Sequence, residues 1–177
     1  MIFIETKLPG VFIVELQLLE DNRGFFGRSF CCHEFAERGL SPKVSQCNIS
    51  FNRDAGTLRG MHYQAAPHAE EKLIRCNRGS SYDVIVDLRR ELPTYKQWIA
   101  LELTEDNRRM IYIPKGCAHG FQTLTDNTEI FYQMSEFYHP ESARGVRWND
   151  PSFGIYWPIG DRAILSDRDR DWPDYSE

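Results

Sequence analysis

Four polar side chains stand inside segments that otherwise have the composition of β-strands, and their types suit proton transfer. These residues are His62, Lys72, His119 and Tyr132. A lone strand histidine or tyrosine is usually a hydrogen-bonded core residue, and a lone strand lysine usually protects an edge strand. Together, however, an imidazole pair, an ammonium and a phenol in one interior would cost stability unless they serve a reaction. We therefore predict a pocket for general acid–base chemistry.

The spacing of Arg59 and His62 sets a condition on this pocket. Strict strand alternation places residues three apart on opposite faces of a sheet. Gly60 lies between the two, and a β-bulge there would turn both side chains to the same face.

Two other chemistries fit the sequence less well. A metal site in a small β-barrel often uses a His-x-His pair, but the sequence after His62 is Tyr63-Gln64, so His119 would have too few companion ligands. No Gly-x-Ser-x-Gly, P-loop or Gly-x-Gly-x-x-Gly motif is present. We predict no metal at this site.

The segments around these residues predict an antiparallel β-sandwich or barrel. Turn signals recur about every ten residues, and no long amphipathic helices alternate with the strands. One short helix is expected over 33–39, and the aromatic tail from 141 onward is expected to pack on the body. The expected strands are 11–18, 24–30, 44–51, 57–64, 72–77, 81–88, 97–103, 110–113, 118–124 and 129–136.

Composition bounds the class of protein. The 177 residues, 41% of them hydrophobic, suit one globular domain over 1–177. A net charge of -5 argues against a nucleic-acid backbone as partner. Neither a signal peptide nor a membrane segment is apparent. The five cysteines are odd in number and lack a Cys-x-x-Cys pair, so we expect reduced thiols and a cytoplasmic protein.

Eight segments in order resemble the dTDP-4-dehydrorhamnose 3,5-epimerase family over about residues 10–172. They are 21–26 (DNRGFF), 46–48 (QCN), 58–64 (LRGMHYQ), 72–73 (KL), 83–89 (DVIVDLR), 113–121 (IPKGCAHGF), 148–151 (WNDP) and 165–169 (LSDRD). The resemblance implies an all-β, double-stranded β-helix or jelly-roll (cupin-like) barrel with short peripheral helices. It also implies a homodimer without metal or organic cofactor.

The resemblance also implies a role for each site residue. The general base corresponds to His62, the aspartate that holds it to Asp169, the acid on the opposite sugar face to Tyr132, and the enolate-stabilising cation to Lys72. Such enzymes invert C3 and C5 beside the C4 ketone of a nucleotide-linked 6-deoxyhexose, in deoxysugar biosynthesis. The residues expected to bind the substrate are Arg23, Phe26, Arg28, Gln46, Asn48, Arg59, His119, Tyr138 and Arg168. Arg23 is expected to reach the diphosphate from a partner subunit, and Tyr138 to stack on the nucleobase.

Departures from the family pattern leave alternatives open. Arg28 stands where the family commonly has a glutamate that reads thymine, and a guanidinium has donors only. A CDP-linked sugar is therefore an alternative to a dTDP-linked one. Cys47, Cys117 and Gln133 also differ from the pattern, which leaves a C3-only epimerase open. A keto-isomerase on the same fold and a non-catalytic nucleotide-sugar-binding barrel are the remaining alternatives.

Overall fold

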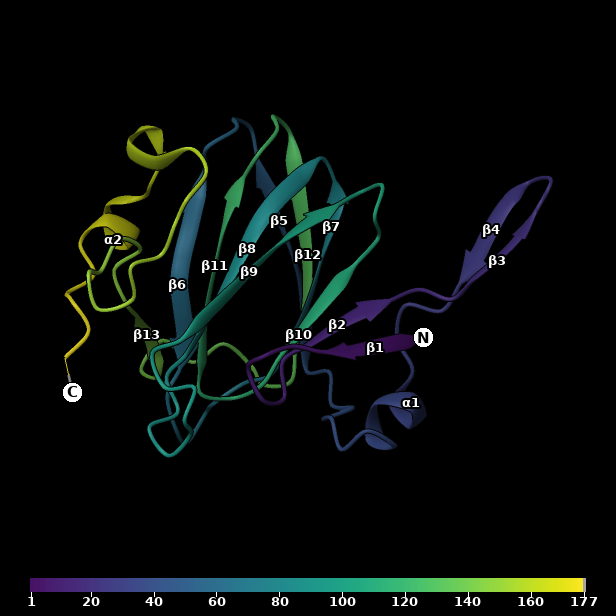
Figure 1. Ribbon diagram of the computed structural model, residues 1–177, viewed down its shortest axis with the longest axis horizontal. Helices are drawn as coiled ribbons and strands as arrows, with labels where there is room; N and C mark the ends of the chain where they lie inside the picture. The colour runs from purple at the N-terminus through teal and green to yellow at the C-terminus, as the bar shows by residue number, and fades with distance from the viewer. Residues whose placement is uncertain (177) are drawn as a thin grey trace.

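Two antiparallel sheets and a projecting hairpin make up the fold in a computed structural model that describes residues 1–176 (Figure 1). The six-stranded sheet has the order β1 (Ile2–Glu5), β2 (Phe12–Glu15), β10 (Met110–Ile113), β7 (Lys72–Arg78), β12 (Thr128–Met134) and β5 (Gln46–Asn52). The five-stranded sheet has the order β13 (Ala143–Gly145), β6 (Leu58–Gln64), β11 (Cys117–Thr123), β8 (Ser80–Asp87) and β9 (Trp98–Thr104). From β5 to β8 and again from β10 to β13, successive strands alternate between the two sheets, so the expected jelly-roll, cupin-like fold is confirmed.

The main core fills the space between the sheets. Ile74 and Ile130 from the six-stranded sheet pack with Ile85 and Phe121 from the five-stranded sheet. Burial of these aliphatic and aromatic side chains stabilises the fold by roughly 1.5–3 kcal/mol each. The two sheets are thereby held face to face.

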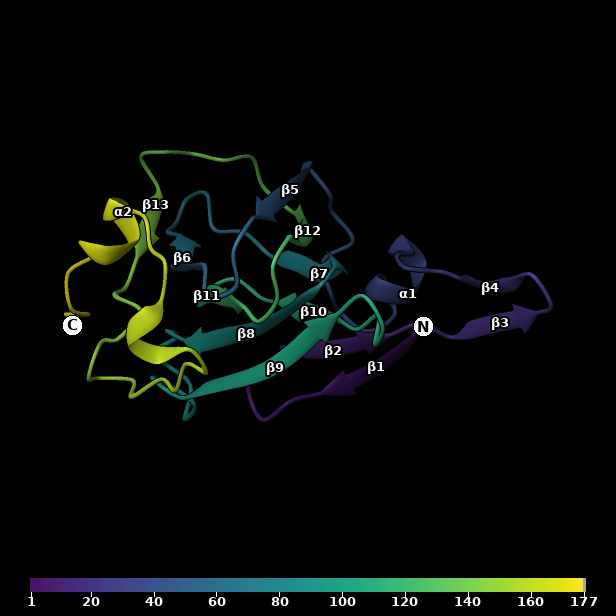
Figure 2. The ribbon, with the colours of Figure 1, turned by 90° about the horizontal axis from the view of Figure 1, so that it is seen from above.

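The C-terminal tail covers the outer face of the five-stranded sheet, as the aromatic composition predicted (Figure 2). Phe153 and Trp157 are buried against Val84 and Val86 of β8. This cover explains why all seven residues of β11 are buried. Tyr156 is the exception among the tail aromatics, with 64% of its surface exposed.

The N-terminal region differs from the expected strands. The segment predicted as one strand over 11–18 divides into β2 and β3 (Leu18–Asp21), and the next strand, β4 (Gly24–Gly27), stops before Phe30. β2 is paired on both sides, by β1 and β10, only from Phe12 to Val14, and Glu15 pairs with β1 alone. Beyond Glu15 the chain leaves the sheet, and β3 and β4 form a hairpin that projects from the body (Figure 1).

Helices are few and short. α1 (Cys32–Ala36) begins one residue before the expected helix over 33–39 and ends three residues before its end. α2 (Asp167–Arg170) and the 3-10 turn η1 (Gly160–Arg162) lie in the tail. Among the described residues, no helix has the length and apolar character needed to cross a bilayer.

Candidate active site

A bulge in β6 brings Arg59 and His62 to the same side. His62 lies opposite His119 of β11 and Arg59 lies opposite Phe121, so three steps along β6 match two along β11. Gly60 has φ +141°, and a Cβ atom there would lie 2.5 Å from the Gly120 Cα atom. Only glycine fits so close a backbone approach. The structure therefore contains the β-bulge at Gly60 that Arg59 and His62 need in order to share one face of the sheet.

The polar end of the barrel contains two adjoining cavities with three residues in common. His62, Lys72 and Tyr132 line both the outer cavity, of about 340 Å³, and the inner cavity, of about 210 Å³. His62 comes from the five-stranded sheet, whereas Lys72 and Tyr132 come from the six-stranded sheet. The imidazole and the phenol therefore face the same space from opposite walls, with the ammonium on the wall of the phenol.

His62 is held by a buried carboxylate. Its Nε2 atom lies 2.5 Å from Oδ1 of Asp169, whose side chain is only 7% exposed. Asp169 lies in the first turn of α2, and its backbone N–H donates to the capping Ser166 Oγ at 3.2 Å. Burial alone would raise the pKa of Asp169, but the hydrogen bond and charge of His62 outweigh it and lower that pKa. An ionised Asp169 fixes the tautomer of His62 and stabilises its imidazolium.

A second histidine–aspartate pair lies beside the first. His119 Nε2 is 2.9 Å from Asp83 Oδ2, and Ser81 Oγ donates to Asp83 Oδ1 at 2.6 Å. Burial lowers the pKa of His119, although Asp83 opposes this effect. A neutral imidazole held by an aspartate has a fixed orientation in the lining of the inner cavity.

Tyr132 and Lys72 occupy the opposite wall. Burial raises the pKa of Tyr132, so its phenol keeps its proton at neutral pH. Lys72 Nζ lies 2.9 Å from Glu70 Oε1 and donates to the backbone oxygen of His62 at 3.4 Å. Arg59, also in the inner cavity, donates to Asn52 Oδ1 at 2.8 Å. The site thus has a base, an acid and cations around one space.

Four of the expected substrate-binding residues line the outer cavity. They are Gln46, Asn48, Tyr138 and Arg168. Gln46 Oε1 accepts a hydrogen bond from the Tyr138 backbone N–H at 3.0 Å, which fixes the start of the loop that carries this ring. Tyr138 is half exposed, so its aromatic face is available to stack on a planar group.

The three expected residues of the projecting hairpin region lie outside both cavities. Arg23 pairs with Asp21 at 2.5 Å and its side chain is 85% exposed. Phe26 is 68% exposed, and Arg28 pairs with Glu34 at 3.0 Å. These positions are separate from the pocket of their own chain.

Sequence reasoning missed three charged residues of the site. Asp83 holds His119, Glu70 pairs with Lys72, and Arg144 of β13 lines the outer cavity. Asp83 had a detectable signal, because a carboxylate inside the apolar strand Asp83-Val84-Ile85 requires a partner. Glu70 and Arg144 lie in segments whose course the sequence does not reveal.

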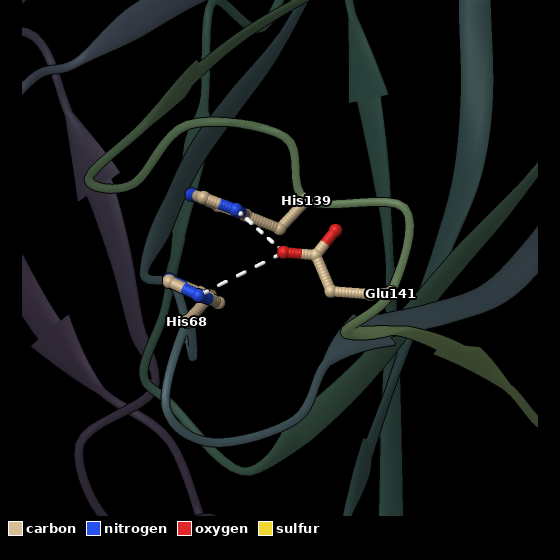
Figure 3. A group of neighbouring side chains, drawn as sticks. All are labelled: His68, His139 and Glu141. Atoms are coloured by element: carbon tan, nitrogen blue, oxygen red, sulfur yellow. Dashed lines mark hydrogen bonds and ion pairs between the residues drawn. The ribbon is translucent and has the colours of Figure 1, made fainter.

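One further cluster has ligand types suited to a metal ion. Among the described residues, His68, His139 and Glu141 have ligand atoms within 4.8 Å of one another (Figure 3). The two imidazole rings are stacked, with centroids 3.5 Å apart and planes 7° from parallel. Because an imidazole nitrogen binds a metal in the plane of its ring, one ion cannot suit both rings as they stand. None of the three lines either cavity.

Comparison with known proteins identifies the family. The sequence model described as dTDP-4-dehydrorhamnose 3,5-epimerase matches residues 5–177. The epimerase of that name from Methanothermobacter thermautotrophicus is 42% identical over 172 residues, which are 96% of this chain and 92% of that protein. The crystal structure of the Bacillus anthracis epimerase with TDP and PPi bound has a TM-score of 0.93 and 42% identity, covering 98% of each chain.

A third relative was solved with a sugar nucleotide. It is the epimerase from Legionella pneumophila in complex with dTDP-4-keto-L-rhamnose, with a TM-score of 0.87, 37% identity, and coverage of 94% of this chain and 88% of that one. Family model, sequence relatives and fold agree over nearly the whole chain. The chain therefore belongs to the dTDP-4-dehydrorhamnose 3,5-epimerase family of isomerases.

Proposed function

We propose that this protein inverts C3 and C5 of a dTDP-4-keto-6-deoxyhexose, with His62 as base and Tyr132 as acid. The observation that carries the proposal is the pair of cavities lined by His62, Lys72 and Tyr132 from two opposite sheets. Inversion needs removal of a proton on one face of the sugar and delivery on the other. A base and an acid on facing walls meet that requirement.

The first step is removal of the proton beside the C4 ketone by neutral His62. Asp169 at 2.5 Å stabilises the imidazolium that forms. Negative charge develops on the ketone oxygen, and the ammonium of Lys72 stabilises this enolate. Lys72 donates one hydrogen bond to the backbone of His62 at 3.4 Å, so the cation and the base are held together.

The second step is delivery of the phenolic proton of Tyr132 to the same carbon from the opposite face. The raised pKa of Tyr132 keeps this proton in place until the enolate has formed. Solvent then restores the proton to Tyr132 and removes the one from His62. The same residues serve C5 once the ring presents that carbon.

Thymine is the proposed nucleobase. Arg28 is held by Glu34 at 3.0 Å, so its guanidinium already has an acceptor and does not require the N3 atom of cytosine. The relative from Bacillus anthracis was solved with TDP. Tyr138, half exposed at the outer cavity, is the proposed stacking partner of the base.

The proposed functional unit is a homodimer in which the β3–β4 hairpin completes the partner's site. Arg23 is 85% exposed on a hairpin that leaves its own body (Figure 1). A guanidinium in that position is suited to the diphosphate of a substrate bound to the second copy. A cytoplasmic location is also part of the proposal, and the five free thiols, typical of a reducing compartment, support it.

Incubation in deuterium oxide with dTDP- and CDP-4-keto-6-deoxyglucose tests the proposal, read by NMR. We expect deuterium at C3 and C5 of the dTDP sugar together with inverted product. Preferred turnover of the CDP sugar would contradict the assignment of thymine. Deuterium at C3 alone would make the protein a C3 epimerase, and no exchange in either sugar would contradict the function.

A further inference from the structure

Glu70 contributes a buried carboxylate to the pocket wall directly beside Lys72. Its side chain is 4% exposed, its Oε1 atom lies 2.9 Å from Lys72 Nζ, and it lines the outer cavity together with His62 and Tyr132. Glu70 precedes β7 by two residues, so the short stretch leading into the strand fixes the carboxylate near the end of the lysine side chain.

The two acceptors around the Lys72 ammonium set its direction. An ammonium has three N–H bonds in a fixed tetrahedral arrangement. Glu70 Oε1 at 2.9 Å and the His62 backbone oxygen at 3.4 Å occupy two of them from the wall. The third N–H bond is left for a ligand in the cavity. A preoriented donor at the position of a developing oxyanion lowers the barrier to enolate formation.

The charge of Glu70 matters as much as its position. The second carboxylate oxygen, Oε2, is buried without a hydrogen-bond partner, which is costly for the folded state. Lys72 is the counter-ion that makes this arrangement tolerable. Conversely, a buried ammonium without a counter-ion would favour its neutral form, and a neutral amine could not stabilise an enolate.

The carboxylate of Glu70 also affects the pKa of Tyr132, which lines the same cavity. The pKa of Tyr132 is raised mainly by burial; the positive charge of Arg59 lowers it and the negative charge of Glu70 raises it further. The other charged or titratable groups around the two cavities are His62, Tyr63, Lys72, His119, Tyr138, Arg144, Arg168 and Asp169. The negative charge of Glu70 therefore acts on both Lys72, the cation of the proposed mechanism, and Tyr132, its acid.

We propose that Glu70 is a positioning residue of the epimerase site, which aims the Lys72 ammonium at the ketone oxygen and whose negative charge extends activity toward higher pH. This proposal rests on the proposed function of Lys72 and Tyr132. Glu70 touches Lys72 and acts through it, so it affects turnover more than substrate binding.

Glu70→Gln tests the proposal, because it keeps the shape and an acceptor but removes the charge. Glu71→Gln is the matched control: Glu71 is the next residue, pairs with Lys115 and Ser135, and lines neither cavity. We expect Glu70→Gln to lower kcat about 10-fold or more with KM changed less than about threefold. The alkaline limb of its pH profile of kcat should move to lower pH, because Tyr132 loses its proton more easily without the negative charge. Glu71→Gln should match the parent in both.

A kcat and an alkaline limb in Glu70→Gln equal to those of Glu71→Gln would overturn the proposal. Glu70→Asp is the second variant and decides the matter if Glu70→Gln does not fold. Glu70→Asp keeps the charge but moves it away from Lys72 by one methylene group, so kcat should fall while the alkaline limb of the pH profile of kcat stays in place. A shift of that limb in Glu70→Asp would also overturn the proposal. Lys72→Met tests the underlying function separately, since full activity in that variant would contradict the role of Lys72 itself.

Discussion

At the scale of single residues, the catalytic proposal depends on the contact between His62 and Asp169. The two atoms are 2.5 Å apart, and the carboxylate is almost completely buried. Replacing the carboxylate by an amide keeps the size but removes the charge that stabilises imidazolium. We expect Asp169→Asn to reduce kcat by about 10²-fold or more with little change in KM, measured by steady-state kinetics. Unchanged kcat would show that His62 does not need Asp169.

The lowered pKa of Asp169 also predicts how stability depends on acid. A carboxyl group whose pKa is lower in the folded than in the unfolded state contributes stability above its unfolded value, near 4. That contribution is lost as pH falls through the folded value. Urea unfolding between pH 7 and pH 3 should therefore show a steeper loss of unfolding free energy in the parent than in Asp169→Asn. Parallel curves would contradict the assignment of the pKa shift to this pair.

The sequence predicted single residues best where a polar type interrupts an apolar strand. His62, Lys72, His119 and Tyr132 were recognisable in this way, and all four line the inner cavity. Asp169 was accessible only through the resemblance, because it lies in an irregular tail. Glu70 could not be predicted, since its importance comes from its neighbour in space and not from its own context.

At the scale of elements, the β6 bulge at Gly60 positions the pocket. A Cβ atom there would meet Gly120 Cα at 2.5 Å, and φ is +141°. Gly60→Ala should destabilise the fold by about 2–4 kcal/mol, by urea unfolding, because both the backbone strain and the clash must be relieved.

Gly24→Ala is the control for that experiment. Gly24 has a similar φ of +131°, but nothing lies within 4 Å of its added Cβ atom. Its cost should therefore be limited to the backbone term, about 1–2 kcal/mol. Equal losses in the two variants would mean that the contact with Gly120 is not what excludes a side chain at Gly60.

Element prediction succeeded where the hydrophobic pattern and the pairing partners agree. The strands over 57–64, 72–77 and 110–113 were expected within one residue of β6, β7 and β10. The prediction of a single strand over 11–18 was wrong, because the strand-forming residues continue past the point where β10 ceases to pair with β2. Pairing with a distant strand decides where a strand ends, and composition does not reveal it.

At the scale of the whole molecule, the proposed role of Arg23 requires two copies that share their sites. If Arg23 of one copy serves His62 of the other, a mixed dimer of His62→Ala and Arg23→Ala chains contains one intact site and one doubly defective site. Two inactive preparations, mixed and allowed to exchange, should then regain about a quarter of the parental activity. Mixtures that stay inactive after verified exchange would contradict a site built from both copies.

The fold of the whole chain followed from the resemblance more than from the residues alone. Strand spacing indicated only a sandwich or barrel. The eight ordered segments specified a jelly roll, which the topology of the two sheets confirms. The projection of the hairpin from the body could not be predicted, because its large side chains, such as Leu19 and Phe26, are mostly exposed and leave no pattern of burial in the sequence.

The assignment of His62 as base and Tyr132 as acid is tested most directly by Tyr132→Phe, which separates proton removal from proton delivery. Deuterium exchange and product stereochemistry are followed by NMR in deuterium oxide, with His62→Ala as the companion variant. With His62 as base and Tyr132 as acid, Tyr132→Phe exchanges protons beside the ketone but forms inverted product at least about 10²-fold more slowly, and His62→Ala exchanges at neither carbon. Epimerisation by Tyr132→Phe at the parental rate would contradict the account.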